Sequence, residues 1–286
     1  MIVVAVKEAA FAGSWYPAGA SACEKEIEGF LEDPAIRSVE DRPIAGGIVP
    51  HAGWFFSGSI ACHVIRCLGR QTIPDVIVIF GMHLAPRSPR YIMTEGAWQT
   101  PFGPLTVEKD LAAELTRRLR FTVEREGRYL QDNTIELQLP FIKYFFNDVK
   151  IVPIGVPPES ASLEVGRAVV EIAAEIGLRV KVIGSTDLTH YGSNYGFAPK
   201  GKGRAAVDWV REENDRRVID AMLALDPGRV IDEALARQNA CCAGAAATAI
   251  EAGKRLGAKK ADMLAYMTSY DKVPGDSLVG YVGMVF

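Results

Sequence analysis

Three of the four histidines in the sequence follow short apolar runs that are typical of buried β-strands. Residues 44–49 precede His51, residues 76–80 precede His83, and residues 180–183 precede the segment that contains His190. The carboxyl ends of the strands in an open α/β sheet meet at one edge, and ligands bind there. We therefore expect these side chains to converge, and our central hypothesis is that they bind a metal ion.

Cys241 supplies a third candidate ligand. Residues 243–256 form an alanine-rich helical pattern, which places Cys241 at or near the N-terminus of a helix. The partial positive charge of a helix N-terminus lowers the pKa of a thiol and favours the thiolate, the form that binds metals or attacks substrates. Two imidazoles and one anionic ligand suit non-haem Fe(II) and some catalytic zinc sites, and imidazole and thiolate also suit copper. Ligand type alone leaves the metal open.

Asp187 and His190 are three residues apart in an expected loop or first helical turn. They could form a hydrogen-bonded pair beside the metal, which would orient a ligand or transfer a proton. In the structural alternative, Asp187 is a helix cap and Cys241 is a small buried apolar residue. The histidines match no short metal motif such as H-E-x-x-H, so spacing alone leaves both interpretations open.

The remaining histidine and three of the cysteines are interpreted as structural. His63 is in register with apolar residues of a helical pattern, which indicates a packed, hydrogen-bonded side chain. Cys23, Cys62 and Cys67 also fall in helical patterns and are expected to be core thiols. The sequence has no C-x-x-C pair, which excludes a structural zinc ribbon.

The composition is that of an ordinary globular protein, with 286 residues, 49% hydrophobic residues, 23% charged residues and a formal net charge of −3. No basic stripe with interleaved aromatics is present, so nucleic acid is not an expected partner. The apolar run of residues 1–6 ends at Lys7 and Glu8, too short for a signal peptide or a membrane span. We therefore expect a cytoplasmic protein without membrane contact.

Strand-like and helical patterns alternate along the chain, which predicts an α/β fold in a single domain over residues 1–286. Expected strands cover residues 44–49, 76–80, 90–94, 149–156, 180–183, 261–268 and 279–286. Expected helices cover residues 20–31, 110–119, 134–141, 161–176, 201–225, 226–236 and 243–256, with another that begins at Ser57 or Ser59. A bend is expected near Pro140.

Three aromatic residues lie close to the candidate ligands in the sequence. Trp15 and Tyr16 lie between Gly13 and Pro17 in a loop signature, and Trp54 lies three residues after His51. They could either close off an edge of the core or line a binding pocket. Packing is the commoner role for aromatics and is favoured on pattern alone.

Taken together, six short motifs resemble the Memo family, also called AmmeMemoRadiSam system protein B. They are Gly13-Ser14-Trp15-Tyr16-Pro17, Pro50-His51-Ala52-Gly53, Ser57-Gly58, Ile135-Glu136-Leu137-Gln138-Leu139-Pro140, Ser185-Thr186-Asp187-Leu188-Thr189-His190 and Gly275-Asp276-Ser277-Leu278-Val279-Gly280-Tyr281. Their order is kept from near residue 10 to the C-terminus, so the resemblance covers almost the whole chain.

The resemblance implies a fold similar to class III extradiol (LigB-type) non-haem iron dioxygenases, with a central mixed sheet flanked by helices on both faces. It implies metal ligands at His51, His83 and Cys241, with Asp187 and His190 as catalytic residues nearby. Fe(II) is then the expected metal, with Cu or Zn as alternatives, and Trp15, Tyr16 and Trp54 are expected to bind substrate. The family name also implies an association with radical-SAM and AMMECR-type proteins.

Three departures from the family pattern bear on the site. Residues 132–134 read Asp-Asn-Thr where the family usually has Glu-His-Ser, and Asn133 cannot exchange a proton as histidine does. Cys241 is followed by Cys242 where the family has glycine, so either cysteine could be the ligand, and register favours Cys241. The loop before His83 is one residue shorter than usual, which could move His83 relative to His51.

Three functions remain in competition. The first is a metal-dependent redox enzyme that uses Fe(II) and oxygen on a small molecule. The second is a scaffold that binds a ligand or peptide in the same pocket without catalysis. The third is a metal-free hydrolase with Cys241 as nucleophile, His190 as base and Asp187 to orient it, and it ranks last because it leaves His51 and His83 without a role.

Overall fold

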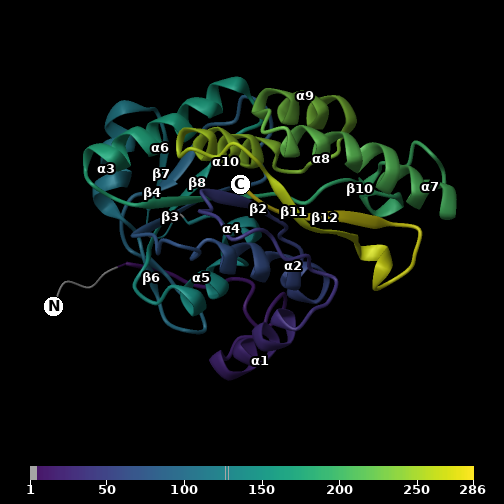
Figure 1. Ribbon diagram of the computed structural model, residues 1–286, viewed down its shortest axis with the longest axis horizontal. Helices are drawn as coiled ribbons and strands as arrows, with labels where there is room; N and C mark the ends of the chain where they lie inside the picture. The colour runs from purple at the N-terminus through teal and green to yellow at the C-terminus, as the bar shows by residue number, and fades with distance from the viewer. Residues whose placement is uncertain (1–4, 126, 128) are drawn as a thin grey trace.

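A mixed β-sheet runs through the middle of the protein, with helices on both of its faces (Figure 1). The computed structural model describes residues 5–125, 127 and 129–286, so the first four residues of the apolar N-terminal run lie outside it. Over these residues the main sheet has nine strands in the order β10-β12-β2-β9-β3-β8-β4-β7, with β11 paired to β12. The expected α/β fold with a central mixed sheet is confirmed.

Four parallel strands form the centre of this sheet. They are β2 (Gly46–Val49), β9 (Val180–Ser185), β3 (Val76–Gly81) and β8 (Lys150–Gly155). All of their residues are buried except Lys150, because helices cover both faces of the sheet. Their carboxyl ends share one edge, where the chain leaves β2, β3 and β9 toward the predicted ligands.

The outer strands give the sheet its mixed character. On one side, β4 (Tyr91–Met93) is antiparallel to β8, and β7 (Thr122–Glu124) is parallel to β4. On the other, β12 (Leu278–Val285) is antiparallel to β2 and pairs with both β11 (Asp262–Thr268) and β10 (His190–Tyr191). A separate small sheet contains β1 (Val6–Lys7), β5 (Ala97–Trp98) and β6 (Leu105–Thr106).

The helices form two layers (Figure 1). One layer holds α3 (Lys109–Arg118), α6 (Leu163–Glu175), α8 (Asp215–Leu223), α9 (Pro227–Arg237) and α10 (Ala243–Arg255). The opposite layer holds α1 (Ala20–Leu31), α2 (Trp54–Cys67), α4 (Asn133–Glu136) and α5 (Leu139–Phe145). None of the helices in the described residues has both the length and the apolar character needed to cross a bilayer.

The shorter helical segments are α7 (Arg204–Trp209), a π-helical stretch η3 (Val210–Asn214), and the 3₁₀ turns η1 (Ser160–Ser162), η2 (Ser193–Tyr195) and η4 (Ser269–Asp271). The segment η3 joins α7 to α8, so the long helix expected over residues 201–225 begins at Arg204 and contains a π-helical segment.

Helix α2 begins earlier than expected. Its cap is Gly53 and its first residue is Trp54, whereas the sequence predicted a cap at Ser57 or Ser59. The backbone N–H of Trp54 donates to the carbonyl of Trp15 at 2.8 Å, and the Trp54 ring stacks on Phe141 with 4.2 Å between centroids. Burial of this ring fixes the first turn, and the Ser57 hydroxyl instead donates to the carbonyl of Ala52.

The helix expected over residues 134–141 is divided into α4 and α5, with the break at Leu137 and Gln138. Pro140 lies in the first turn of α5, where its missing N–H leaves no hydrogen bond unmade, so it starts a helix instead of bending one. The Gln138 side chain donates to the carbonyl of Pro50 at 2.9 Å, which ties this break to the loop that carries His51.

Candidate metal centre

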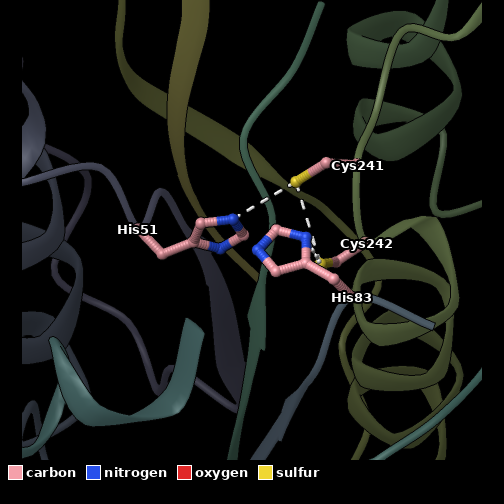
Figure 2. Close-up of side chains that lie close together, drawn as sticks. All are labelled: His51, His83, Cys241 and Cys242. Atoms are coloured by element: carbon pink, nitrogen blue, oxygen red, sulfur yellow. Dashed lines mark hydrogen bonds between the residues drawn. The ribbon is translucent and has the colours of Figure 1, made fainter. Parts of the chain in front are cut away.

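The carboxyl edge of the sheet brings together two histidines and two cysteines (Figure 2). His51 follows β2, His83 follows β3, and the two cysteines precede α10, with Cys242 as its N-terminal cap residue. One donor atom from each of the four lies within 4.8 Å of the others. The convergence expected for His51, His83 and Cys241 is therefore present, and Cys242 joins them.

The distances between donor atoms fit a single ion. The Cys241 Sγ lies 3.2 Å from His51 Nε2, the Cys242 Sγ lies 3.4 Å from His83 Nδ1, and the two sulfurs are 3.7 Å apart. An ion with bonds of about 2.0 Å to nitrogen and 2.3 Å to sulfur in tetrahedral geometry holds its ligands roughly 3.3–3.8 Å apart. The donor set thus needs only small side-chain movements to bind such an ion.

The electrostatics of the cluster favour one thiolate. Burial opposes ionisation of Cys241, but hydrogen bonds with Cys242 and His51, together with the charge on His51, hold its pKa well below the usual value. Burial also disfavours the charged form of His51, but Asp187 and Cys241 outweigh it and raise the pKa of His51 to about 9. Burial and the neighbouring Cys241 raise the pKa of Cys242 well above its usual value.

Hydrogen bonds with three neighbouring residues hold His51 in place. Its backbone N–H donates to Asp187 Oδ1 at 2.7 Å, and its Nδ1 lies 3.0 Å from the Ser185 hydroxyl. Asn133, at the position that departs from the family pattern, donates to the His51 carbonyl at 3.1 Å. Such outer hydrogen bonds fix the ring orientation and leave Nε2 directed at Cys241 (Figure 2).

Asp187 and His190 lie at the same cavity but do not form the expected hydrogen-bonded pair. Asp187 is directed to the backbone of His51, and burial raises the pKa of its carboxyl above the usual value despite the opposing charge of His51. His190 Nδ1 lies 3.1 Å from the Leu188 carbonyl, and its ring packs against Tyr195 at 4.9 Å. The hydrogen bond is missing because Asp187 Oδ1 accepts from the His51 backbone, while His190 Nδ1 faces the Leu188 carbonyl.

A cavity of about 500 Å³ lies beside the two histidines of the cluster. Its lining includes His51, His83, Asp187 and His190, together with Trp15. His83 is exposed at this cavity whereas His51 is buried, so a bound ion would be open to ligands from the His83 side.

Tyr16 and Trp54, also expected to bind substrate, belong to the core and not to the cavity wall. They are 4% and 1% exposed. The Tyr16 hydroxyl donates to Glu136, and Trp54 Nε1 donates to the carbonyl of Leu137 at 3.1 Å. Their role in the structure is to pack the loop of His51 against α4 and α5. His63 is also packed, as expected, with Nε2 2.9 Å from the carbonyl of Phe30.

Several contributors to the site were missed from the sequence. The Thr186 hydroxyl accepts a hydrogen bond from the Cys242 N–H at 3.1 Å, and the Cys241 N–H donates to the Asp187 carbonyl, so the end of β9 positions the cysteine turn. Tyr195 and Tyr281 also line the cavity. Thr186 could have been found from the sequence, because it directly precedes the candidate Asp187. Tyr281 lies in one of the motifs of the family resemblance, whereas Tyr195 gave no signal, because its turn approaches the site only in three dimensions.

A buried polar network links the two loops that carry the site. The Asn214 side chain donates to the Thr189 hydroxyl at 2.9 Å, and the Asn239 side chain donates to the Asn214 carbonyl at 2.9 Å. Asp215 accepts from the Thr189 N–H at 3.0 Å and from the Tyr266 hydroxyl at 2.7 Å. The junction of η3 and α8 therefore anchors both the segment after Asp187 and the segment before Cys241.

This network predicts a pH-dependent stability. Burial raises the pKa of Asp215 to about 7 against the hydrogen bonds from Thr189 and Tyr266. The pKa of Asp215 in the folded state therefore lies above its value of about 3.9 in the unfolded state. The neutral carboxyl contributes fully to the stability of the fold below about pH 3.9, and this contribution is lost as the pH rises through about 7. We expect the stability of Asp215→Asn to depend less on pH than that of the native protein. The free energy of unfolding of the variant, relative to that of the native protein, should therefore rise by a few kcal/mol between pH 4 and pH 8. Denaturant unfolding at both pH values measures this; an equal pH response in the two proteins would contradict it.

Comparison with known proteins finds relatives that match almost the whole chain. The family model described as Memo-like protein matches residues 7–285. A MEMO1 family protein of Pyrococcus abyssi is 33% identical over 98% of this chain and 99% of its own, and one of Methanosarcina barkeri is 36% identical with the same coverage. A crystal structure of an uncharacterized protein from Escherichia coli K12 shares the fold, with a TM-score of 0.54 and 11% identity over 85% of this chain and all of that chain.

Proposed function

The chain belongs to the Memo-like family, and we propose that it holds a metal ion at His51, His83 and Cys241 for redox chemistry on a small molecule. The observation that carries the proposal is the set of four donor atoms within 4.8 Å of one another, two of which belong to His51 and His83 in the wall of a cavity. Iron(II) is the ion we propose first. Copper and zinc are the alternatives, and the second thiol of Cys242 favours them because soft ligands select Cu(I) and Zn.

A bound iron or copper ion would supply one-electron redox chemistry with oxygen as co-substrate. The residues of the chain would do the rest. Asp187 fixes the backbone of His51, and the exposed side of His83 leaves room for a substrate in the cavity. Because a carbonyl only accepts, the neutral ring of His190 carries its proton on Nδ1 toward Leu188, and its Nε2 remains free to take a proton in the cavity.

The role of His190 gives a direct test. We expect His190→Gln to retain the metal and to lower turnover by roughly 100-fold, the lower range for loss of a general base. Oxygen uptake by the metal-loaded protein with a panel of small aromatic and aliphatic substrates measures it, with His63→Gln as the control because His63 lies outside the cavity. Unchanged turnover in His190→Gln would remove His190 from the reaction.

A binding role without catalysis is the second candidate. Trp15 is 41% exposed and Phe55 is 63% exposed, and both line the cavity, where they could hold a ligand or a peptide. This alternative predicts that ligand binding survives in the double variant His51→Ala/Cys241→Ala. The metal-free hydrolase is not favoured, because the imidazole 3.2 Å from Cys241 belongs to His51 and not to His190.

The cellular setting is also a proposal. All five cysteines are free, which suits a reducing compartment such as the cytoplasm. An association with radical-SAM and AMMECR-type proteins, which the family resemblance implies, remains part of the proposal and would be tested by co-purification.

A further inference from the structure

A second cavity of about 560 Å³ lies at the far end of α2 from the metal centre. Trp54 begins α2 beside the loop of His51, and Arg66 lies in its last turn, about 18 Å away at 1.5 Å per residue. The two cavities share no lining residue. Whatever this second cavity binds is therefore separate from the metal centre.

The lining of this cavity carries positive charge without a matching carboxylate. Arg37, Arg66 and Arg70 line it together with His63, and no Asp or Glu side chain of the described residues does so. Arg70 donates to the carbonyls of Val39 and Glu40 at 2.8 and 3.1 Å. Arg37 and Arg66 form no ion pair with any described residue, although most of the clear ion pairs elsewhere in the protein involve arginine.

Helix capping explains only part of this arrangement. Arg66 lies in the last turn of α2, where a cation favours the helix dipole. Arg37 comes from the loop after α1 and is placed here by a hydrogen bond from its backbone N–H to the carbonyl of Leu264. Three guanidinium groups, two from the C-terminal end of α2 and the turn after it and one from the loop after α1, therefore gather around one cavity in a chain of net charge −3.

Apart from Ser38, the remaining side chains of the cavity wall are apolar. Phe145, Phe146 and Leu264 contribute to it, and Ile73 lines it with 65% of its surface exposed. Guanidinium groups bind phosphate through paired N–H donors, and apolar walls take up the body of a ligand. The volume falls within the roughly 300–1,000 Å³ of small-molecule sites.

We propose that this cavity is a binding site for an organic phosphate with an aromatic body, of about the size of a mononucleotide. The phosphate contacts Arg37 and Arg66, and the aromatic body lies against Phe146 and Ile73. The site does not depend on the metal centre.

Calorimetric titration of the full-length protein with AMP and with phenyl phosphate tests the proposal. We expect one site per chain, with adenosine and inorganic phosphate each binding at least tenfold more weakly than AMP. The double variant Arg37→Gln/Arg66→Gln should weaken AMP binding at least tenfold. Arg120→Gln is the matched control, because Arg120 is an exposed arginine outside the cavity.

Four results of these titrations would overturn the proposal. They are absence of binding by both phosphates at millimolar concentration, equal binding of adenosine and AMP, equal binding of inorganic phosphate and AMP, and an unchanged affinity in the double arginine variant. His51→Ala separates this site from the metal centre: AMP binding that persists supports the proposal whether or not the protein binds metal, and AMP binding that is lost places the ligand at the metal and overturns it.

Discussion

Replacing Cys241 with alanine is expected to lower the affinity for the metal by more than about 100-fold, beyond the roughly 10–100-fold cost of removing an outer hydrogen-bond partner. Cys241 is the thiol whose pKa is held well below its usual value, so it is ready as a thiolate beside His51. Equilibrium titration of the apo-protein with Fe(II), Cu(I) and Zn(II) under anaerobic conditions measures the effect.

Cys242→Ala is the matched control for this variant. Both residues lie in the same turn before α10, but Cys242 is buried and its pKa is raised well above the usual value. We expect Cys242→Ala to weaken binding about tenfold or less. A larger loss in Cys242→Ala than in Cys241→Ala would reverse the assignment, and thermal unfolding of both variants would show that the fold is retained.

Gly244→Ala is expected to destabilise the protein by about 1–3 kcal/mol, the usual cost of forcing an extra group into a packed site. A Cβ at Gly244 would lie 2.4 Å from the carbonyl oxygen of Pro157 and 2.6 Å from that of Val156. Both contacts are to backbone, so the start of α10 must move away from the end of β8. Because Cys241 and Cys242 directly precede α10, metal affinity should fall as well.

Gly29→Ala is the control variant, and its stability is expected to change in the opposite direction. Gly29 lies in α1, and a Cβ there would have no heavy atom within 4 Å. Alanine in a helix interior is favoured over glycine by roughly 0.5–1 kcal/mol, so this variant should gain stability and bind metal normally. Denaturant unfolding measures both variants, and a Gly244→Ala protein as stable as the native one would show that α10 has more freedom than the structure indicates.

The sequence was sufficient for the residues whose surroundings are set by a local pattern. The apolar runs before His51 and His83 predicted buried parallel strands, and strands of that kind end at one edge of the sheet. The alanine-rich run after Cys242 predicted α10. Convergence of His51, His83 and Cys241 follows from these elements and from the family resemblance.

Other features depended on contacts between distant segments. Trp54 starts α2 because Phe141, which is far away in the sequence, covers its ring, and no capping residue announces this. Tyr16 is buried because the carboxylate of Glu136 accepts a hydrogen bond from its hydroxyl. The pair expected for Asp187 and His190 required the pairing of β10 with β12 to be known, and this pairing directs the two side chains to different partners.

Cys242 shows most clearly what could not be predicted from the sequence. In the sequence, two adjacent cysteines left the choice of ligand open, since neighbouring side chains usually point in different directions. In the structure, the turn before α10 places both sulfurs on the same cluster, 3.7 Å apart. Hydrogen bonds from the end of β9 set this turn, and no local pattern encodes them.

The metal content of the protein after anaerobic purification is the most direct test of the central claim. Elemental analysis should find close to one equivalent of iron, copper or zinc in the native protein and none in His51→Ala/Cys241→Ala. If neither protein contains metal, and reconstitution with Fe(II), Cu(I) and Zn(II) also fails, the cluster of His51, His83, Cys241 and Cys242 is not a metal centre.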